Sequence, residues 1–100
     1  MQVQSLTLVT IIVESILQEQ LCQLVLELGS TGYTISTCNG SGSHGTRSGL
    51  MDVDMNVKIE ILAHQTVADS ITSEVKRRFA TNYGLILFTQ PVTALANRQI

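Results

Sequence analysis

Residues 56–62 read NVKIEIL, and this stretch decides the fold. Apolar side chains at Val57, Ile59 and Ile61 alternate strictly with the charged Lys58 and Glu60. Because successive side chains of a β-strand point to opposite faces of a sheet, the alternation predicts a strand with one face in the core.

The sequence after this strand predicts a helix and a further strand. Residues 66–81 place apolar side chains four positions apart, at Val67, Ile71, Val75 and Phe79. Thr66 and Asp69 have the spacing of an N-terminal capping pair, and the cations at 76–78 suit the negative end of the helix dipole. GLILFTQ, residues 84–90, is the predicted last strand, which Pro91 should stop. His64 is predicted to be a turn residue.

The preceding sequence supplies two strands and a helix. VQSLTLVTIIV, residues 3–13, and YTISTC, residues 33–38, have the branched and aromatic composition of strands. Between them, residues 15–29 form a predicted helix, with a capping box of Ser15 and Gln18 and with Gly29 as C-terminal cap. Its apolar stripe comprises Ile16, Leu17, Leu21, Leu24, Val25 and Leu28.

The element order is therefore β-α-β-β-α-β, which predicts an α+β, ferredoxin-like fold: a four-stranded antiparallel sheet with two helices on one face. The 100 residues fit one domain, which we place at 1–92, followed by a tail at 93–100. The opposite sheet face carries too many apolar side chains to face water, so we expect subunits to bury it. Lys58 and Glu60 on that face either pair across the interface or form a solvated stripe.

Composition excludes several classes of function. With 14% charged residues and a net charge of −2, the chain has no basic field for nucleic acid. The apolar run LTLVTIIV is far shorter than the roughly 20 residues of a membrane span, and we expect a cytoplasmic protein. Cys22 and Cys38 lack the spacing of a zinc or redox site, so buried free thiols are expected. No nucleophile, base and orienting residue form a recognisable set, and we expect no enzyme.

The connection at 39–55 is much longer than an ordinary hairpin loop, and its part at 39–49 reads NGSGSHGTRSG. Its glycines allow successive backbone amides to converge on an anion, and Arg47 can bind a phosphate in bidentate fashion. The same composition fits a linker. His44 is better explained as a solvent-exposed loop residue than as a metal ligand, a base or a phosphate contact. Asp52 and Asp54 could hold Mg²⁺ beside a bound triphosphate or form a solvated pair.

The stretch GSTGYTISTCNGSGSHGTRS, in a chain of this element order, resembles the PII-like signalling proteins, and most closely the SbtB-type branch associated with bicarbonate transport. Gly29, Thr31, Gly32, Tyr33, Thr34 and Ile35 match the strand entry of that family. The glycine-rich core is matched by Gly40, Gly42, Ser43, Arg47 and Ser48. NVKIEIL and TNYGLILF also fit.

The resemblance implies a homotrimeric regulator that binds an adenine nucleotide, namely ATP, ADP, AMP or cyclic AMP, in clefts between subunits. The implied nucleotide-binding residues are Thr34, Gly40, Gly42, Ser43, Arg47, Gly84 and Leu85. A flexible T-loop at 39–55 would contact a target protein such as a membrane transporter in carbon or nitrogen metabolism. The implied partner-binding residues are His44, Thr46, Ser48, Gly49, Met51 and Asp52.

Two other regulators share the topology. An ACT-type domain would bind an amino acid, and a CutA-type trimer would bind a metal, although the sequence lacks the clustered ligands that a metal requires. The chain also departs from the PII-like family that it resembles: it has no loop tyrosine for uridylylation, and Ser41 and His44 stand where members of that family often carry cations. An RNA-binding sheet would need exposed aromatic residues, and NVKIEIL has none.

Overall fold

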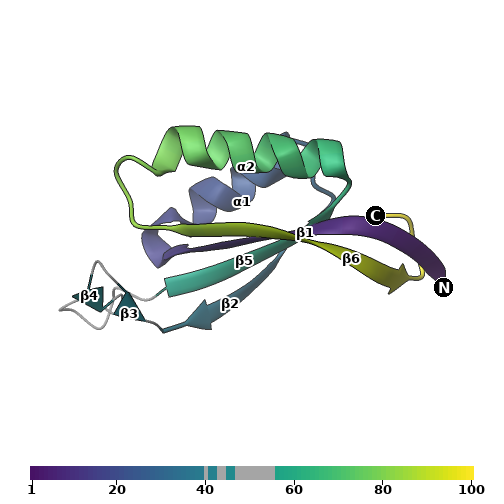
Figure 1. Cartoon of the computed structure of the whole chain (residues 1–100), viewed down its shortest axis with the longest axis horizontal. Coiled ribbons are helices and arrows are strands. Elements are labelled where there is room, and N and C mark those ends of the chain that lie inside the picture. Colours follow the sequence, from purple (N-terminus) through teal and green to yellow (C-terminus); the bar gives the residue numbers. More distant parts are fainter. Residues whose placement is uncertain (40, 43–44, 47–55) are drawn as a thin grey trace.

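The computed structural model describes residues 1–39, 41–42, 45–46 and 56–100. The elements in chain order are the strand β1, a 3₁₀ turn η1, the helix α1, the strands β2 to β5, the helix α2 and the strand β6 (Figure 1). Their bounds are β1 Gln2–Glu14, η1 Ser15–Leu17, α1 Gln18–Glu27, β2 Thr34–Cys38, β3 Ser41–Gly42, β4 Gly45–Thr46, β5 Asn56–Ala63, α2 Gln65–Phe79 and β6 Ile86–Ala96.

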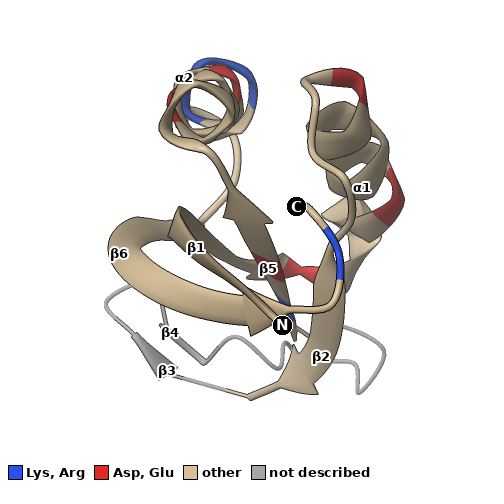
Figure 2. Ribbon diagram, turned by 90° about the vertical axis from the view of Figure 1, so that its right-hand side faces the viewer, with Lys and Arg blue, Asp and Glu red and all other residues tan. Residues whose placement is uncertain are grey.

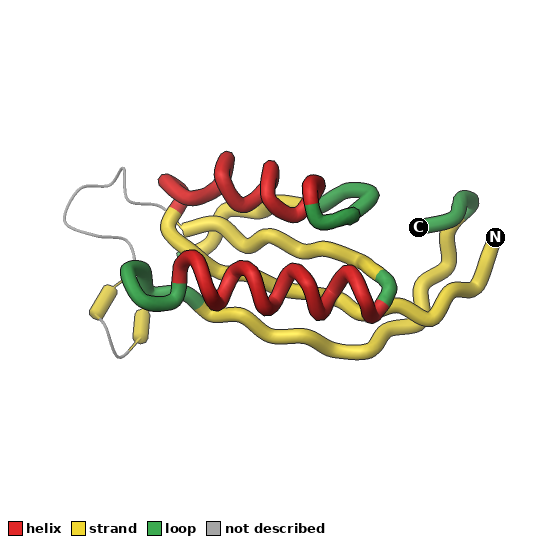
Figure 3. The backbone as a smooth tube through the Cα atoms, turned by 90° about the horizontal axis from the view of Figure 1, so that it is seen from above, coloured by secondary structure: helices red, strands yellow, loops and turns green. Residues whose placement is uncertain are grey.

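The main sheet has four strands in the order β2-β5-β1-β6, and every neighbouring pair is antiparallel. Both helices cover the same face of this sheet and lie side by side (Figures 2 and 3). The predicted ferredoxin-like α+β fold is confirmed. The strand β1 is the longest, and its first residues pair only with β6, so that a two-stranded ribbon extends beyond the helices toward both ends of the chain.

The core lies between the sheet and the helices, and the alternation of NVKIEIL is confirmed. Val57, Ile59 and Ile61 are 2%, 0% and 0% exposed, whereas Lys58 and Glu60 lie half-buried on the face away from the helices. From α2, the predicted stripe is present: Val67 packs against the core, and Ile71, Val75 and Phe79 lie within it. At about 25 cal/mol per Å² of apolar surface, each such large side chain contributes roughly 1.5–3 kcal/mol by its burial.

The start of α1 differs from the prediction. Residues 15–17 form a 3₁₀ turn, and the α-helix begins only at Gln18. Ser15 therefore caps nothing, and Ile16, predicted to lie on the buried stripe, is 75% exposed. A 3₁₀ turn has 3.0 residues per turn instead of 3.6, so the side chains before Gln18 are out of phase with those of the helix.

The end of α1 matches the prediction. Gly29 has φ +109°, a conformation that side chains rarely adopt. Its N–H donates to Leu26 O at 3.1 Å, and the next N–H, of Ser30, donates to Val25 O at 3.0 Å. These two bonds form a Schellman motif, which satisfies carbonyl groups at the helix end and turns the chain back toward the sheet.

The capping pair predicted for α2 is not formed. His64 occupies the N-cap position, and no side chain bonds the free amides there. Asp69 instead accepts from Gln65 Nε2 at 2.8 Å, because the helix begins at Gln65, one residue earlier than predicted. The cations of the last turn, Lys76, Arg77 and Arg78, lie where the sequence placed them.

Pro91 does not stop the last strand. The strand β6 begins at Ile86, two residues later than predicted, and continues through Pro91 to Ala96, and Pro91 is in register with Thr7 of β1. The reason is that β6 is an edge strand, so only one of its sides needs hydrogen bonds, and a residue without an N–H is tolerated there. Four residues of the predicted tail, 93–96, therefore belong to the sheet.

The sheet face away from the helices is partly open in this protomer. Ile86 and Phe88 of β6 are 46% and 44% exposed, and they lie next to the half-buried Ile12 of β1. Within the long connection, the backbone of β3 pairs with that of β4 in a separate two-stranded sheet, which the sequence did not predict. Among the described residues, no helix is long and apolar enough to cross a membrane.

Candidate functional site

A cavity of about 350 Å³ lies over three neighbouring strands. Its floor consists of two cross-strand pairs, Leu8 with Leu62 and Thr34 with Glu60. These residues alternate with core residues such as Val9 and Ile61, so the cavity is on the face away from the helices. The full lining is Leu8, Thr31, Gly32, Tyr33, Thr34, Glu60, Leu62, Arg98 and Ile100.

One wall of the cavity is the α1–β2 loop, and local hydrogen bonds fix its path. After the Schellman turn at Gly29, the buried hydroxyl of Ser30 accepts from the Gly32 N–H at 3.1 Å and donates to the Gly32 carbonyl. A serine that bonds the backbone two residues ahead holds a tight turn. The backbone of Thr31–Thr34 is thereby held along the edge of the cavity.

Tyr33 in this wall contacts the buried Cys22 of α1. Burial raises the pKa of the Cys22 thiol, while a hydrogen bond with Tyr33 acts in the opposite direction. The pKa of Tyr33 is also raised, first by the charge that Cys22 would carry, then by their hydrogen bond and by desolvation. Both groups therefore stay protonated at neutral pH, and Cys22 is a buried free thiol as predicted. Tyr33, predicted to be a packing residue, both contacts the helix and lines the cavity.

The opposite wall comes from residues that follow β6. Arg98 contributes a positive charge and Ile100 an apolar side chain, while Glu60 provides a negative charge on the floor. Among the described residues, ion pairs form only within α2, so Arg98 and Glu60 are not bonded to each other. A cavity with one cation, one carboxylate, two threonine hydroxyls and apolar leucines can bind a molecule that is anionic at one end and carries donor groups and an apolar ring.

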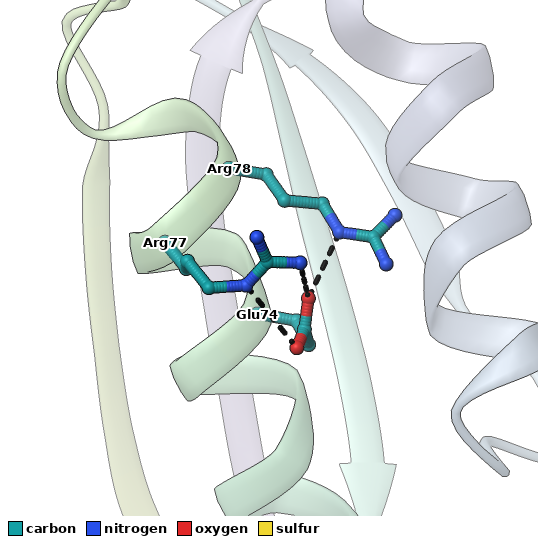
Figure 4. Close-up of polar contacts among 3 residues, drawn as sticks. All are labelled: Glu74, Arg77 and Arg78. Carbon is teal, nitrogen blue, oxygen red and sulfur yellow. Dashed lines mark hydrogen bonds and ion pairs between the residues drawn. The ribbon is translucent and has the colours of Figure 1, made fainter.

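The cations of α2 are arranged differently. Glu74 Oε2 lies 2.8 Å from Arg77 Nη2 and 2.9 Å from Arg78 Nε (Figure 4). Hydrogen bonds from Arg77 and Arg78 lower the pKa of Glu74, and the same carboxylate raises the pKa of Arg77. All three groups are on the surface, so this network contributes little to stability, and the single carboxylate of Glu74 offsets only part of the positive charge at the end of α2.

The sequence-predicted site residues are only partly brought together. Thr34 lines the cavity, whereas Gly84 and Leu85 do not: they precede β6, the strand at the far edge from β2, and Leu85 packs against the core. Gly42 and Thr46 belong to the backbones of β3 and β4. The remaining predicted residues lie outside the described part of the chain: Gly40, Ser43, His44, Arg47, Ser48, Gly49, Met51 and Asp52.

The sequence did not single out several lining residues as a site, above all Glu60 and Arg98. A signal for each is present in retrospect. Glu60 is the one carboxylate in the strand Asn56–Ala63, and Arg98 is the one charged residue in TALANRQI, residues 93–100. No group of three or more His, Cys, Asp or Glu side chains that could hold a metal occurs in the part of the chain that the structure describes.

Comparison with known families decides the relationship. The family described as nitrogen regulatory protein P-II matches residues 6–98, nearly the whole chain. The chain belongs to the nitrogen regulatory protein P-II family. In this P-II family chain, the match includes β1, β5, the α1–β2 loop and Arg98, so it covers nearly all of the cavity described above.

Solved structures agree with the P-II assignment. A PII-like signaling protein from Thermus thermophilus is 32% identical, with a TM-score of 0.82 over 95% of this chain and 94% of that one. CPII from Thiomonas intermedia, bound to ADP, AMP and bicarbonate, has the same fold at 20% identity, with a TM-score of 0.80 over 94% and 99% of the two chains. The Bacillus subtilis GlnK–ATP complex aligns at 21% identity and a TM-score of 0.62 over 86% and 82%. No protein with a curated description matches.

Proposed function

We propose that this P-II family protein is a regulator that binds an adenine nucleotide in the cavity between β1, β5, the α1–β2 loop and residues 98–100. The observation that carries the proposal is the placement of Arg98 on one wall and of Glu60 on the floor of the same cavity, with the hydroxyl-bearing Thr34 paired to Glu60 across the strands. A regulator needs a ligand whose binding free energy differs between two conformational states, and this cavity is a candidate site for such a ligand.

The chemistry of the lining suits a nucleotide. The guanidinium of Arg98 can form charge-assisted, bidentate hydrogen bonds with a phosphate. The carboxylate of Glu60 can accept from the amino group of adenine or from ribose hydroxyls, and Leu8 with Leu62 offers an apolar surface for the ring. The volume of about 350 Å³ lies at the lower end of the usual range for small-molecule sites, about 300–1,000 Å³.

Two structurally similar proteins support the choice of nucleotide. CPII from Thiomonas intermedia was solved with ADP and AMP, and the Bacillus subtilis GlnK complex contains ATP. We extend the adenine nucleotide class to this chain, without a preference among ATP, ADP, AMP and cyclic AMP and with Mg²⁺ as an optional companion. The bicarbonate bound by CPII is also consistent with the SbtB-type branch, which stays a prediction here.

The glycine-rich connection completes the proposed site. Gly40, Gly42, Ser43 and Arg47 would supply phosphate contacts in addition to that of Arg98, and the rest of 39–55 would contact the target protein. Gly84 and Leu85 lie away from the cavity in one protomer, so they could reach a nucleotide only from a neighbouring subunit. The half-exposed Ile86 and Phe88 are suited to a subunit interface, and a homotrimer is the assembly we propose.

The test is a binding panel on the purified protein. ATP, ADP, AMP and cyclic AMP are titrated by calorimetry and thermal shift, beside a set of amino acids and divalent metals. A nucleotide at 100 times its dissociation constant should stabilise the fold by about 2.7 kcal/mol, which corresponds to several degrees for a domain of this size. Stabilisation by an amino acid or a metal alone, with all nucleotides silent, would contradict the proposal.

Matched variants locate the site. Arg98→Ala should weaken nucleotide binding by about 1.5–3 kcal/mol, the contribution of a hydrogen bond to a charged group. Arg77→Ala removes the same charge from a side chain that is 66% exposed and, among the described residues, contacts Glu74, so it should leave the affinity unchanged. If both variants bind as the wild type does, the cavity is not the phosphate site.

A further inference from the structure

Residues 97–100 are held in place by one buried side chain from the other end of the chain. Gln4 of β1 is 7% exposed, and its Nε2 donates to the carbonyl oxygen of Arg98 at 2.9 Å. Its Oε1 accepts from the Ile100 N–H at 2.9 Å and from Gln99 Nε2 at 3.2 Å. Both polar ends of one amide thus bind three successive residues more than 90 positions away, which is consistent with the adjacent termini in Figure 3.

A second attachment comes from the junction between β5 and α2. His64 Nε2 lies 2.8 Å from the carbonyl oxygen of Ile100. The junction itself is tied to β1, because Thr7 Oγ1 donates to Gln65 Oε1 at 2.8 Å. Residues 97–100 belong to no helix or strand, so these side-chain bonds account for the position of this segment.

The attached segment forms a wall of the cavity. Arg98 and Ile100 both line it, whereas Gln4 and His64 do not. The backbone of Arg98 is bonded directly by Gln4, so the position of the guanidinium depends on an amide outside the cavity. Without the attachment, residues 97–100 would sample many conformations, and only a fraction of the molecules would present Arg98 to the ligand.

We propose that Gln4 is a positioning residue for nucleotide binding, and that it acts by holding residues 98–100 against the cavity, with His64 as the second attachment. This inference rests on the proposed nucleotide function. The apparent dissociation constant of a ligand is its intrinsic value divided by the fraction of molecules that are competent to bind. Linkage is reciprocal, so a bound nucleotide must in turn hold the segment in place.

The first experiment measures ADP binding by calorimetry in Gln4→Ala, with Gln2→Ala as the matched control. Gln2 is an exposed glutamine on the same strand, and its loss should leave the affinity unchanged. Gln4→Ala should raise the dissociation constant for ADP by about 10-fold to 100-fold. The upper limit is the effect of losing the Arg98 contact entirely. An unchanged dissociation constant in a folded Gln4→Ala protein would overturn the proposal.

A double-mutant cycle separates positioning from general destabilisation. If Gln4 acts through Arg98, then Gln4→Ala should weaken ADP binding much less in an Arg98→Ala background than in the wild type. Additive losses would show that Gln4 affects the cavity by another route, and the proposal would fail. If Gln4→Ala does not fold, His64→Ala takes its place in the test. This substitution removes the second attachment at an exposed position, and it should also weaken ADP binding.

Amide hydrogen exchange of Ile100, whose N–H donates to Gln4 Oε1, provides a readout that does not depend on an affinity measurement. This exchange should accelerate in Gln4→Ala and slow when ADP binds the wild-type protein. A wild-type protein that binds no nucleotide refutes the proposed function. If the wild type binds ADP, and Gln4→Ala shows the same amide exchange rate and the same ADP affinity as the wild type, only the positioning role is refuted.

Discussion

Replacing Asn56 by valine should stabilise the fold. Asn56 begins β5, is 0% exposed, and neither its Oδ1 nor its Nδ2 has a hydrogen-bond partner among the residues that the structure describes. A buried polar group without a partner costs about 1–3 kcal/mol in desolvation. Valine removes this cost, favours strand geometry, and is close enough in size to leave little empty space.

The expected gain from Asn56→Val is therefore about 1–3 kcal/mol, and each kcal/mol raises the melting temperature of a domain this size by roughly 4–8 °C. Thermal and urea unfolding, followed by circular dichroism at one protein concentration, measure the change. Asn39→Val is the matched control, because Asn39 is exposed, and its effect should stay within about 0.5 kcal/mol.

The opposite substitution tests the same reasoning. Asn56→Asp keeps the shape of the side chain but buries a carboxyl group, whose charged form is disfavoured there. It should destabilise the protein at neutral pH, and the difference from wild type should shrink as the pH falls toward the ordinary Asp pKa of about 3.9. A loss of about 1 kcal/mol or more in Asn56→Val, with an unchanged urea dependence, would refute the argument, since it would mean that the amide makes a favourable bond.

Three further variants give testable outcomes. Gly29→Ala should cost about 1–3 kcal/mol of unfolding free energy, because φ is +109° there and a Cβ would lie 3.4 Å from Val67 Cγ2; a neutral result in urea unfolding would show that the Schellman turn is not needed. Burial raises the pKa of Cys22, so the protonated thiol contributes fully to the free energy of unfolding below the usual thiol pKa of 9.0, and this contribution is lost as the pH rises above it. Cys22→Ala should therefore reduce the decrease in unfolding free energy at alkaline pH. The same variant should lower the pKa of Tyr33 toward 10.0, measurable from tyrosinate absorbance, and an unchanged titration would show that the two groups do not interact. Arg47→Ala should weaken nucleotide binding by about 1.5–3 kcal/mol while leaving the melting temperature of the free protein unchanged, and an equal loss of fold stability would make that arginine structural.

The fold could be predicted because its signals are local. Alternation over NVKIEIL fixed one strand and its buried face, and apolar residues four apart fixed the buried side of α2. Local signals were weakest at element ends. The prediction for Pro91 was wrong because the tolerance of a strand for proline depends on whether a neighbour pairs on both sides, and that depends on strand order.

The candidate site could be predicted only in part. Thr34, which the resemblance implied, lines the cavity, and the phosphate site in the glycine-rich segment stays a prediction, because most of that segment lies outside the described residues. Glu60 and Arg98 were not selected as a pair. They lie 38 positions apart in the sequence and come together only because the chain returns along β6 and then folds back across the cavity. The bonds of Gln4 to residues 98–100 are the extreme case, since they join the two ends of the chain.

By itself, the sequence determined the kind and order of the two helices and of the four strands of the main sheet, the buried faces of β5 and α2, and the turn at Gly29, because hydrogen bonding and side-chain periodicity act over a few residues. Only the tertiary structure decided which side chains line the cavity, that Pro91 lies within a strand, and that the buried Gln4 bonds the backbone of residues 98–100. Those contacts join residues tens of positions apart, and their energies appear only after the sheet has brought the strands together.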